Sequence, residues 1–175
     1  MIWPKMVTMM GFLDSQLDAH GFIIGRPGDW IFIDWSEMDK EGALCAEQML
    51  LVMCYRTMAT VQKLIEGANT SDKKNKPDYE QKEKLLREQI EKFFWDEEKK
   101  AYIDSFSSGK RHVTRHANLF AILFDIADEA RCAQIYDSVI ANDAVTQITT
   151  PYFKFYELEA LCKLGKKAEV LQRMK

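Results

Sequence analysis

The sequence predicts an all-α fold in which amphipathic helices surround a layer of buried helices. Three observations lead to this prediction. Apolar residues recur at three- and four-residue steps in some segments but occupy nearly every side of others. The two kinds of segment alternate along the chain. Finally, 8 glycines and 4 prolines in 175 residues supply too few turn signals for an all-β protein.

Four segments carry a single apolar stripe, and we expect each to cover the core from outside. The first begins with Pro4, which suits a first helical turn. Its stripe consists of Ile2, Met6, Met9, Leu13 and Leu17. The striped helices are predicted over residues 4–17, 79–94, 129–140 and from 166 onward.

Three other segments are apolar on most sides and are therefore predicted to be buried helices. They cover residues 41–65, 114–126 and 151–164, and Gly165 ends the last of them. Alternation with the striped segments predicts two concentric layers, a partial toroid of about seven helices. A four-helix bundle would show stripes throughout, and an α-solenoid would show a fixed repeat period. The sequence has neither pattern.

The remaining segments are predicted connections within one domain, which we expect to span residues 1–175. Residues 67–78 read as a polar loop. Short extended segments are expected over residues 31–35 and 101–106, within the longer connections that precede buried helices.

Composition excludes several functions. Lys and Arg number 24 against 27 Asp and Glu, so no basic excess indicates nucleic acid or an acidic membrane surface. Lys5 and Asp14 interrupt the apolar N-terminus, so neither a signal peptide nor a membrane span is expected. No cofactor or metal is predicted, because the cysteines form no C-x-x-C pair. We expect buried free thiols, which favour the cytoplasm and leave the localisation open. The cysteines are Cys45, Cys54, Cys132 and Cys162.

The first candidate site lies between Trp30 and Trp35, where the sequence reads Trp-Ile-Phe-Ile-Asp-Trp. An indole face can meet the apolar C–H face of a sugar ring, and the carboxylate of Asp34 can accept hydrogen bonds from its hydroxyl groups. Trp30, Asp34 and Trp35 are therefore predicted substrate-binding residues. The alternative is that both tryptophans cap the core and Asp34 only opens a helix.

The second candidate site is the polar start of an apolar helix, Arg115 to Asn118. Its polar groups, above all His116 and Asn118, are expected to face the rim, where a helix N-terminus favours hydroxyl or carboxylate ligands. The alternative is that Thr114 caps the helix and His116 is merely hydrogen-bonded. We expect His20 and His112 on the surface and the aromatic cluster at 152–156 in the core.

Four segments, in this order, resemble bacterial α-L-rhamnosidases, glycoside hydrolases with an (α/α)6 six-hairpin toroid. They read GRPGDWIFIDWSEMDKEGALCAEQMLLVMCYRTMATVQKL, FFWDEEKKAYIDSF, VTRHANLFAILFDIAD and ITTPYFKFYELEALCKLGKKAEVL. The resemblance implies carbohydrate metabolism and a partial (α/α)6 domain in which Asp34 and Trp35 line the sugar pocket. It also implies, on fewer matching residues, pocket-side positions for His116 and Asn118.

The resemblance also implies what is missing. The family inverts the anomeric centre with a carboxylic acid and a carboxylate base. Its acid and base motifs lie upstream and downstream of the matched segments and are absent here. We therefore predict no catalytic residue, and Glu37, Glu41 and Asp104 are not assigned that role.

A full toroid has twelve helices, so the chain is expected to be a fragment, inactive alone, and whether it is an enzyme stays open. A rhamnose-containing glycan is the expected partner of the full enzyme. Exposed inner helices are expected to self-associate or to pair with the missing half. Two alternatives remain: an α-solenoid-like interaction scaffold, and a six-hairpin hydrolase acting on another sugar, such as a glucosidase or uronyl hydrolase.

Overall fold

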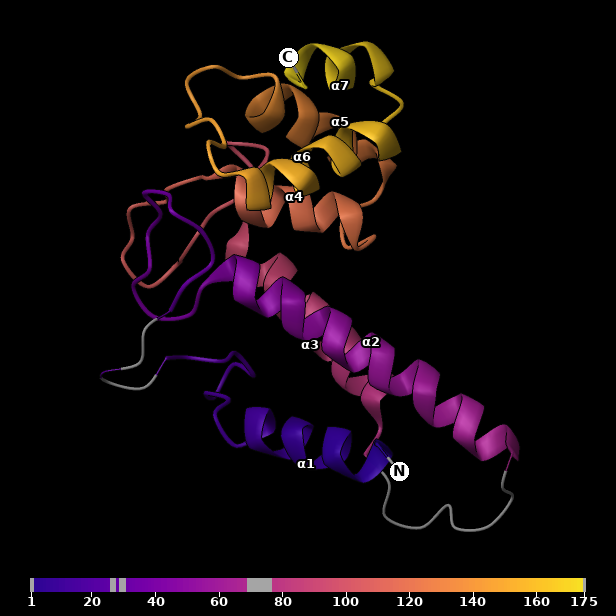
Figure 1. The fold of residues 1–175 in the computed structure, drawn as a ribbon. Coiled ribbons are helices and arrows are strands. Elements are labelled where there is room, and N and C mark those ends of the chain that lie inside the picture. The colour runs from indigo at the N-terminus through magenta and orange to yellow at the C-terminus, as the bar shows by residue number, and fades with distance from the viewer. Residues whose placement is uncertain (1, 26–27, 29–30, 69–76, 175) are drawn as a thin grey trace.

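The structure is a computed structural model and describes residues 2–25, 28, 31–68 and 77–174. In these ranges the chain is all-α, as predicted (Figure 1). The helices are α1 (Trp3–Asp14), α2 (Cys45–Ala68), α3 (Tyr79–Phe94), α4 (Arg115–Leu123), α5 (Glu129–Ile135), the π-helical turn η1 (Tyr136–Ile140), α6 (Pro151–Lys163) and α7 (Lys167–Arg173). The strands β1 (Trp95–Asp96) and β2 (Ala101–Tyr102) form one short antiparallel pair.

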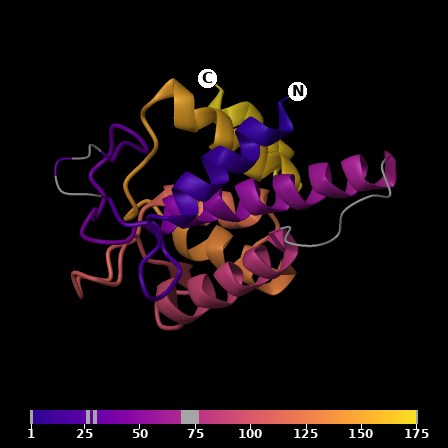
Figure 2. The ribbon, with the colours of Figure 1, turned by 90° about the horizontal axis from the view of Figure 1, so that it is seen from below.

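The helices form two layers, which confirms the alternation seen in the sequence. α2 packs against α4 and α4 against α6, while α3 packs on α2, α5 on α4 and α7 on α6. Figure 2 shows α3 and α5 on one side of α2 and α4. Every residue of α4 from 115 to 122 is buried, whereas α3 buries only one stripe of its surface. That stripe consists of Tyr79, Leu86, Ile90 and Phe94.

The first helix, α1, contacts both members of the next hairpin. The Tyr55 hydroxyl on α2 donates a hydrogen bond to Asp14 Oδ1 at 2.6 Å. Lys82 on α3 pairs with Asp14 Oδ2 at 2.5 Å. The Trp3 ring meets the Tyr79 ring edge-on, with 6.5 Å between the ring centroids. One carboxylate at the end of α1 therefore connects it to two helices.

Element boundaries differ from the prediction where the backbone is left-handed. α2 begins at Cys45 rather than 41, because Gly42 has φ of +72° and a Cβ there would collide with Ser107. α4 ends at Leu123 rather than 126, and Asp125 has φ of +53°. Residues 31–35 form no strand, and the strand expected over 101–106 is limited to Ala101–Tyr102.

Other expectations also needed correction. All four cysteines are free, but only Cys45 is buried, and Cys162 is exposed. The predicted polar loop at 67–78 lies largely outside the described residues, and its first two residues continue α2. Within the ranges that the structure describes, no helix combines the length and apolarity needed to cross a bilayer.

The N-terminal ends of α2, α4 and α6 lie at one edge of the molecule, together with the loops that precede them (Figures 1 and 2). We call this edge the rim and define it by residues 31–44, 103–114 and 141–150. The backbone N–H of Cys45, the first residue of α2, donates to the carbonyl of Asp104 at 2.8 Å. The rim loops are thus bonded to one another as well as to their own helices.

Two buried amide side chains hold neighbouring segments against the inner helices. On α2, Gln48 accepts from the N–H of Ile23 at 2.9 Å and donates to its carbonyl at 3.0 Å. On α4, Asn118 does the same to Tyr102, with both distances 2.9 Å. Each amide supplies the donor and acceptor that a neighbouring β-strand would supply.

A buried carboxylate joins α4, α6 and α7. Glu157 on α6 has no exposed side-chain surface and pairs with Arg115 at 2.5 Å, Lys154 at 2.5 Å and Arg173 at 2.7 Å. Burial by itself raises the pKa of Glu157, but the hydrogen bonds from Lys154 and Arg115 outweigh it and lower the pKa below its ordinary value. Arg115 is also fully buried, so each charge of this pair depends on the other.

Replacing this carboxylate with a neutral amide should therefore be costly. We expect Glu157→Gln to lower the free energy of unfolding by about 3–5 kcal/mol, because Arg115 is left as an uncompensated buried cation. The exposed Glu159 on the same helix provides the control, and Glu159→Gln should change stability by no more than about 0.5 kcal/mol. Urea denaturation of the three proteins measures both values, and equal midpoints for the two variants would contradict the assignment.

Candidate functional site

Asp34 connects three parts of the rim. Its side chain is buried, with a residue exposure of 3%. Asp34 Oδ2 lies 2.9 Å from His116 Nε2 in the first turn of α4. Asp34 Oδ1 accepts a hydrogen bond of 2.7 Å from the hydroxyl of Thr150, the residue before α6. The loop before α2 is therefore fixed to the starts of both other inner helices by one carboxylate.

The Asp34 contact determines which nitrogen of His116 carries its proton. A carboxylate accepts hydrogen bonds, so Nε2 of the imidazole donates. Burial lowers the pKa of His116 despite the opposing effect of Asp34, which favours the neutral ring. The remaining nitrogen, Nδ1, is then a buried acceptor with no hydrogen-bond partner among the described residues. His116 thus retains one unused acceptor at the base of the rim.

The residue next to Asp34 lies on the surface. Trp35 is 73% exposed, and its ring meets that of Phe32 edge-on with 5.1 Å between the ring centroids. A flat aromatic surface therefore lies next to a buried, hydrogen-bonded carboxylate. The sequence predicted an indole and a carboxylate that bind a sugar side by side; the indole of Trp35 is exposed, but both oxygens of Asp34 are already bonded to protein groups.

The aromatic cluster at the start of α6 is not all core, contrary to expectation. Only Phe153 is fully buried, where its ring lies 4.2 Å from that of His116, centroid to centroid. Tyr152 and Phe155 are 58% and 56% exposed. Since α6 begins at the rim, these rings add exposed aromatic surface to its first two turns.

The other predicted site residues are placed differently. The start of α4 was expected to direct its polar groups, above all His116 and Asn118, at the rim rather than into the core, but Arg115, His116 and Asn118 are all buried. Arg115 pairs with Glu157, and the Asn118 amide is occupied by backbone groups. Thr114 precedes α4 but makes no capping hydrogen bond with its side chain. Trp30 lies outside the described residues.

A second carboxylate, Asp104, organises the neighbouring part of the rim. Its Oδ1 accepts from the hydroxyl of Thr114 at 2.7 Å and from the Thr114 N–H at 3.1 Å. Its Oδ2 accepts from the N–H of Asp39 at 3.2 Å and lies 2.6 Å from His112 Nδ1. Asp104 is 2% exposed, whereas the His112 side chain is 44% exposed.

Asp39 extends this cluster. Its carboxylate accepts a hydrogen bond from Ser108 and lies 3.7 Å from the ammonium of Lys110. Burial opposes ionisation of Asp39, but the Ser108 bond, the backbone N–H of Glu41 and the charge of Lys110 lower its pKa overall. Residues 39 and 104–112 therefore form one connected polar network.

The sequence pattern missed Thr150, Asp39 and Asp104 as members of the site. The available signal for Thr150 was its place before the Pro-Tyr-Phe helix, where it also accepts from the Phe153 N–H as an N-cap. Asp39 had none, because its contact with Asp104 spans 65 residues of the chain. The partners Thr114 and His112 of Asp104 lie within ten residues, but no motif marked them as a cluster. His112 was expected on the surface, and its partner Asp104 was not foreseen.

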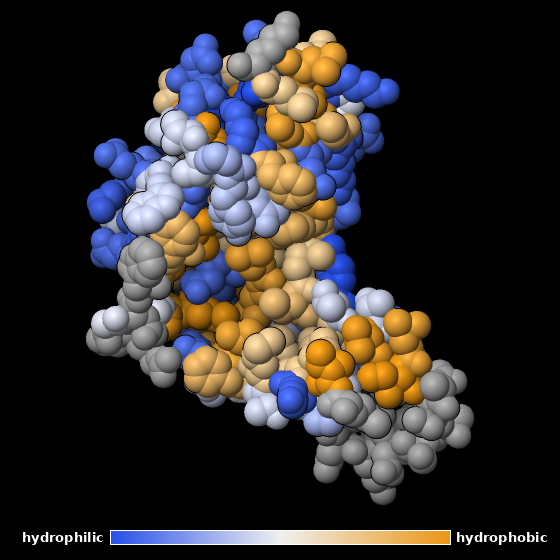
Figure 3. All heavy atoms as spheres, viewed as in Figure 1, coloured by the Kyte–Doolittle hydropathy of each residue, from blue (hydrophilic) through white to orange (hydrophobic). Residues whose placement is uncertain are grey.

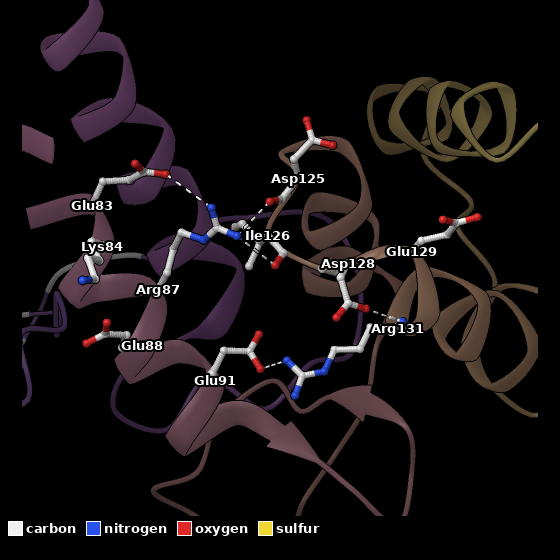
Figure 4. Close-up of a pocket in the computed structure, with 11 residues that line it drawn as sticks. Glu83, Lys84, Arg87, Glu88, Glu91, Asp125, Ile126, Asp128, Glu129 and Arg131 are labelled. Carbon is white, nitrogen blue, oxygen red and sulfur yellow. Dashed lines mark hydrogen bonds and ion pairs between the residues drawn. The ribbon is translucent and has the colours of Figure 1, made fainter. Parts of the chain in front are cut away.

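A separate hollow of about 800 Å³ lies at the opposite end of α4 (Figure 4). Arg87 crosses it from α3 to donate to the carbonyls of Asp125 and Ile126 at 3.0 and 3.2 Å. Arg131 pairs with Glu91 on its other side. Its lining is mostly charged and contains no aromatic ring, so it lacks the surface that sugar stacking needs. Across the described parts of the chain, no group of three or more His, Cys, Asp or Glu side chains is arranged to hold a metal ion.

Comparisons with known proteins agree with this geometry. The family model described as Trehalase matches residues 48–152, more than half of the chain. The structure is similar to the GH78 family rhamnosidase of Bacillus sp. GL1, with a TM-score of 0.78 and 28% sequence identity over 98% of this chain. It has the same fold as a part of a Klebsiella oxytoca rhamnosidase solved with rhamnose bound, with a TM-score of 0.73 and 18% identity over 99% of this chain.

The chain covers only 18% of the Bacillus protein and 32% of the Klebsiella protein. A comparison with curated proteins gives no significant match. The predicted resemblance to rhamnosidases is confirmed, and the all-α architecture is that of a part of a six-hairpin toroid.

The buried His116 predicts a pH dependence of stability. Its pKa is lowered by folding, so the unfolded chain binds this proton first. The contribution of neutral His116 is present above about pH 6.5 and is lost as the pH falls below that value, with a slope of at most about 1.4 kcal/mol per pH unit. Urea denaturation between pH 7.5 and 5.5 measures this loss.

The variant His116→Gln separates this effect from other titrations. A glutamine amide can still donate to Asp34 from the position of Nε2 but does not titrate. We expect the variant to show a smaller loss of stability between pH 7.5 and 5.5 than the wild type. Parallel pH dependences in the two proteins would show that His116 is not the titrating group.

Proposed function

The chain belongs to the trehalase family, and from this premise we propose that it is part of the catalytic domain of a glycoside hydrolase acting on terminal α-L-rhamnosides. The observation that carries the proposal is the similarity over 98% of the chain to the Bacillus rhamnosidase. The match includes the rim, where Trp35 is exposed beside the buried carboxylate of Asp34.

In the proposed site, Trp35 stacks on the sugar and the groups behind it fix its orientation. An exposed indole offers a large apolar face to the C–H side of a pyranose ring. The loop that carries Trp35 is held by the bonds of Asp34 to His116 and Thr150. Because these bonds join the starts of α4 and α6, the stacking surface is preorganised before a ligand arrives, which reduces the entropy lost on binding.

The two buried carboxylates that organise the rim, Asp34 and Asp104, are unsuited to catalysis by inversion. That reaction needs a protonated acid and a carboxylate base on opposite faces of the sugar, about 6.5–9.5 Å apart. Asp34 and Asp104 are buried acceptors whose oxygens are already bonded to protein groups. Asp34 and Asp104 therefore serve to position the loops. From the resemblance to rhamnosidases, we propose that the catalytic pair belongs to other parts of a longer protein.

A second substrate class is favoured by the family match. The model described as Trehalase covers residues 48–152, so an α-glucoside such as trehalose is the alternative ligand for the same rim. An interaction scaffold that ignores sugars is the third reading. It is favoured by the exposed apolar residues on the inner helices, namely Leu50, Leu64, Tyr152 and Phe155.

We further propose that additional helices of the same toroid cover this apolar face in a longer protein. Figure 3 shows apolar side chains gathered across the middle of the face that presents α2, with charged ones around them. A contiguous exposed apolar surface of this kind favours association. The solved relatives, of which this chain covers 18% and 32%, have ample further chain to provide the cover.

The native mass of the protein tests whether further helices of the same chain cover the apolar face. Peptides of this sequence should be found in its source cell within a species several times larger than 20.4 kDa. A native species of about that mass that remains monomeric would contradict the proposed cover. A species of that mass that self-associates through Leu64 and Phe155 would replace it with a homo-oligomer.

Binding of L-rhamnose tests the proposed site. We expect weak binding that Trp35→Ala reduces at least tenfold, because the stacking surface is removed. Phe12→Ala removes an exposed aromatic ring from α1, away from the rim, and should leave the affinity unchanged. Trehalose is titrated in parallel by calorimetry or NMR. Stronger binding of trehalose would favour the α-glucoside reading, and binding of neither sugar would favour the scaffold.

Turnover provides an independent test. The purified chain should not hydrolyse an aryl α-L-rhamnoside above the rate in buffer, because it contributes no acid–base pair. Release of the aryl alcohol is followed by absorbance. Substantial hydrolysis by the chain alone, abolished in Asp34→Asn, would show that this chain itself contains catalytic carboxylates.

A further inference from the structure

The pair formed by Asp104 and His112 has the geometry of a functional histidine. Asp104 Oδ2 lies 2.6 Å from His112 Nδ1. Since a carboxylate accepts, Nδ1 carries the proton, and in the neutral ring Nε2 is left with a free lone pair. The Asp104 carboxylate is buried and the His112 side chain is 44% exposed. A buried group therefore orients the imidazole, while part of the ring remains accessible to solvent.

The loop around His112 is held on both sides. Arg111, with φ of +53°, bonds Asp96 through Nε at 2.5 Å and Nη2 at 2.6 Å, and this hydrogen bonding lowers the pKa of Asp96 to about 2. The carbonyl of His112 accepts from the N–H of Asp104 at 2.8 Å. Both the backbone and the side chain of His112 are therefore fixed, which is how a binding group is preorganised.

The pair belongs to the same rim as Trp35. The segment 34–39 runs from the Asp34 contacts to Asp39, whose N–H donates to Asp104. Five residues of chain span at most about 18 Å. Thr114, the residue before α4, bonds Asp104, and His116 in the first turn of α4 bonds Asp34, so these two carboxylates flank one helix start. An oligosaccharide resting on Trp35 can therefore extend toward His112.

We propose that His112, oriented by Asp104, is a binding residue of this rim whose Nε2 accepts a hydrogen bond from a hydroxyl group of the sugar bound at Trp35. This inference rests on the proposed function and assigns it a further contact. Trp35 supplies an apolar face, and every donor on the sugar needs an acceptor once water is displaced. In its neutral form, His112 offers such an acceptor on the 44% of its side chain that is exposed.

NMR of the wild-type protein tests the inference without any variant, because the chain has only three histidines. The protein is labelled with ¹⁵N, and the imidazole nitrogens and the indole N–H of Trp35 are followed while an α-linked L-rhamnose disaccharide is added. We expect His112 Nε2 and Trp35 to shift with one common dissociation constant, while the exposed His20 stays unchanged. Shifts of Trp35 without His112 would overturn this inference and leave the proposed function standing; shifts of neither would overturn both.

The variant His112→Asn separates binding from loop support. Its amide nitrogen lies where Nδ1 was and can still donate to Asp104, but no acceptor remains at the position of Nε2. We expect the affinity for the sugar to fall about 3- to 10-fold, the effect of one hydrogen bond, with an unchanged amide spectrum elsewhere. His20→Asn is the matched control. An affinity equal to that of wild type in His112→Asn would show that His112 only supports the loop.

Discussion

The rim depends on one residue, Asp104, through both its backbone and its side chain. Its carbonyl receives the first N–H of α2, and its carboxylate receives Thr114 at the start of α4, the N–H of Asp39 and the ring of His112. A buried carboxylate with four acceptor positions can satisfy several donors at once, and leaving any of them unpaired would cost free energy. The relative position of two inner helices and two loops is therefore set by a single side chain and its own carbonyl.

Asp34 repeats this arrangement between α4 and α6, so both rim carboxylates act by joining segments that are distant in sequence. The buried and the exposed residues of the rim therefore have different roles in the proposed site. Buried acids hold the loops, while the more exposed groups beside them, Trp35 and His112, are the ones that we propose contact a ligand. The charged cluster around Glu157 lies behind the same helices and links α4 to α6 and α7. Rigid support behind an open surface is what precise binding requires.

Much of this fold was accessible from the sequence because its signals are local. Periodicity identified α3 with its observed bounds, and the alternation of striped and apolar segments predicted which helices are inner. The candidate site was only partly accessible. The neighbouring Asp34 and Trp35 were singled out because an indole beside a carboxylate is visible in adjacent residues, and their role in sugar binding stays a prediction. Thr150 was not singled out, since its contact with Asp34 spans 116 residues. Asp104 was not, because no local motif marked its contacts with Thr114, His112 and the distant Asp39. The full burial of Asn118 likewise depends on its bonds to Tyr102 in β2, which the residues around position 118 do not predict.

The amide side chains of Gln48 and Asn118 have a consequence for how such a protein can change over evolution. Each amide forms hydrogen bonds only with the backbone of the bound segment, at Ile23 or Tyr102. These bonds therefore do not depend on the identity of that segment's side chains. Ile23 and Tyr102 are themselves buried, but exposed neighbours such as Ile24 and Lys100 can change while the course of these segments over the inner helices is retained. A scaffold built this way can acquire new ligand preferences by loop substitutions alone, provided that the two amides persist.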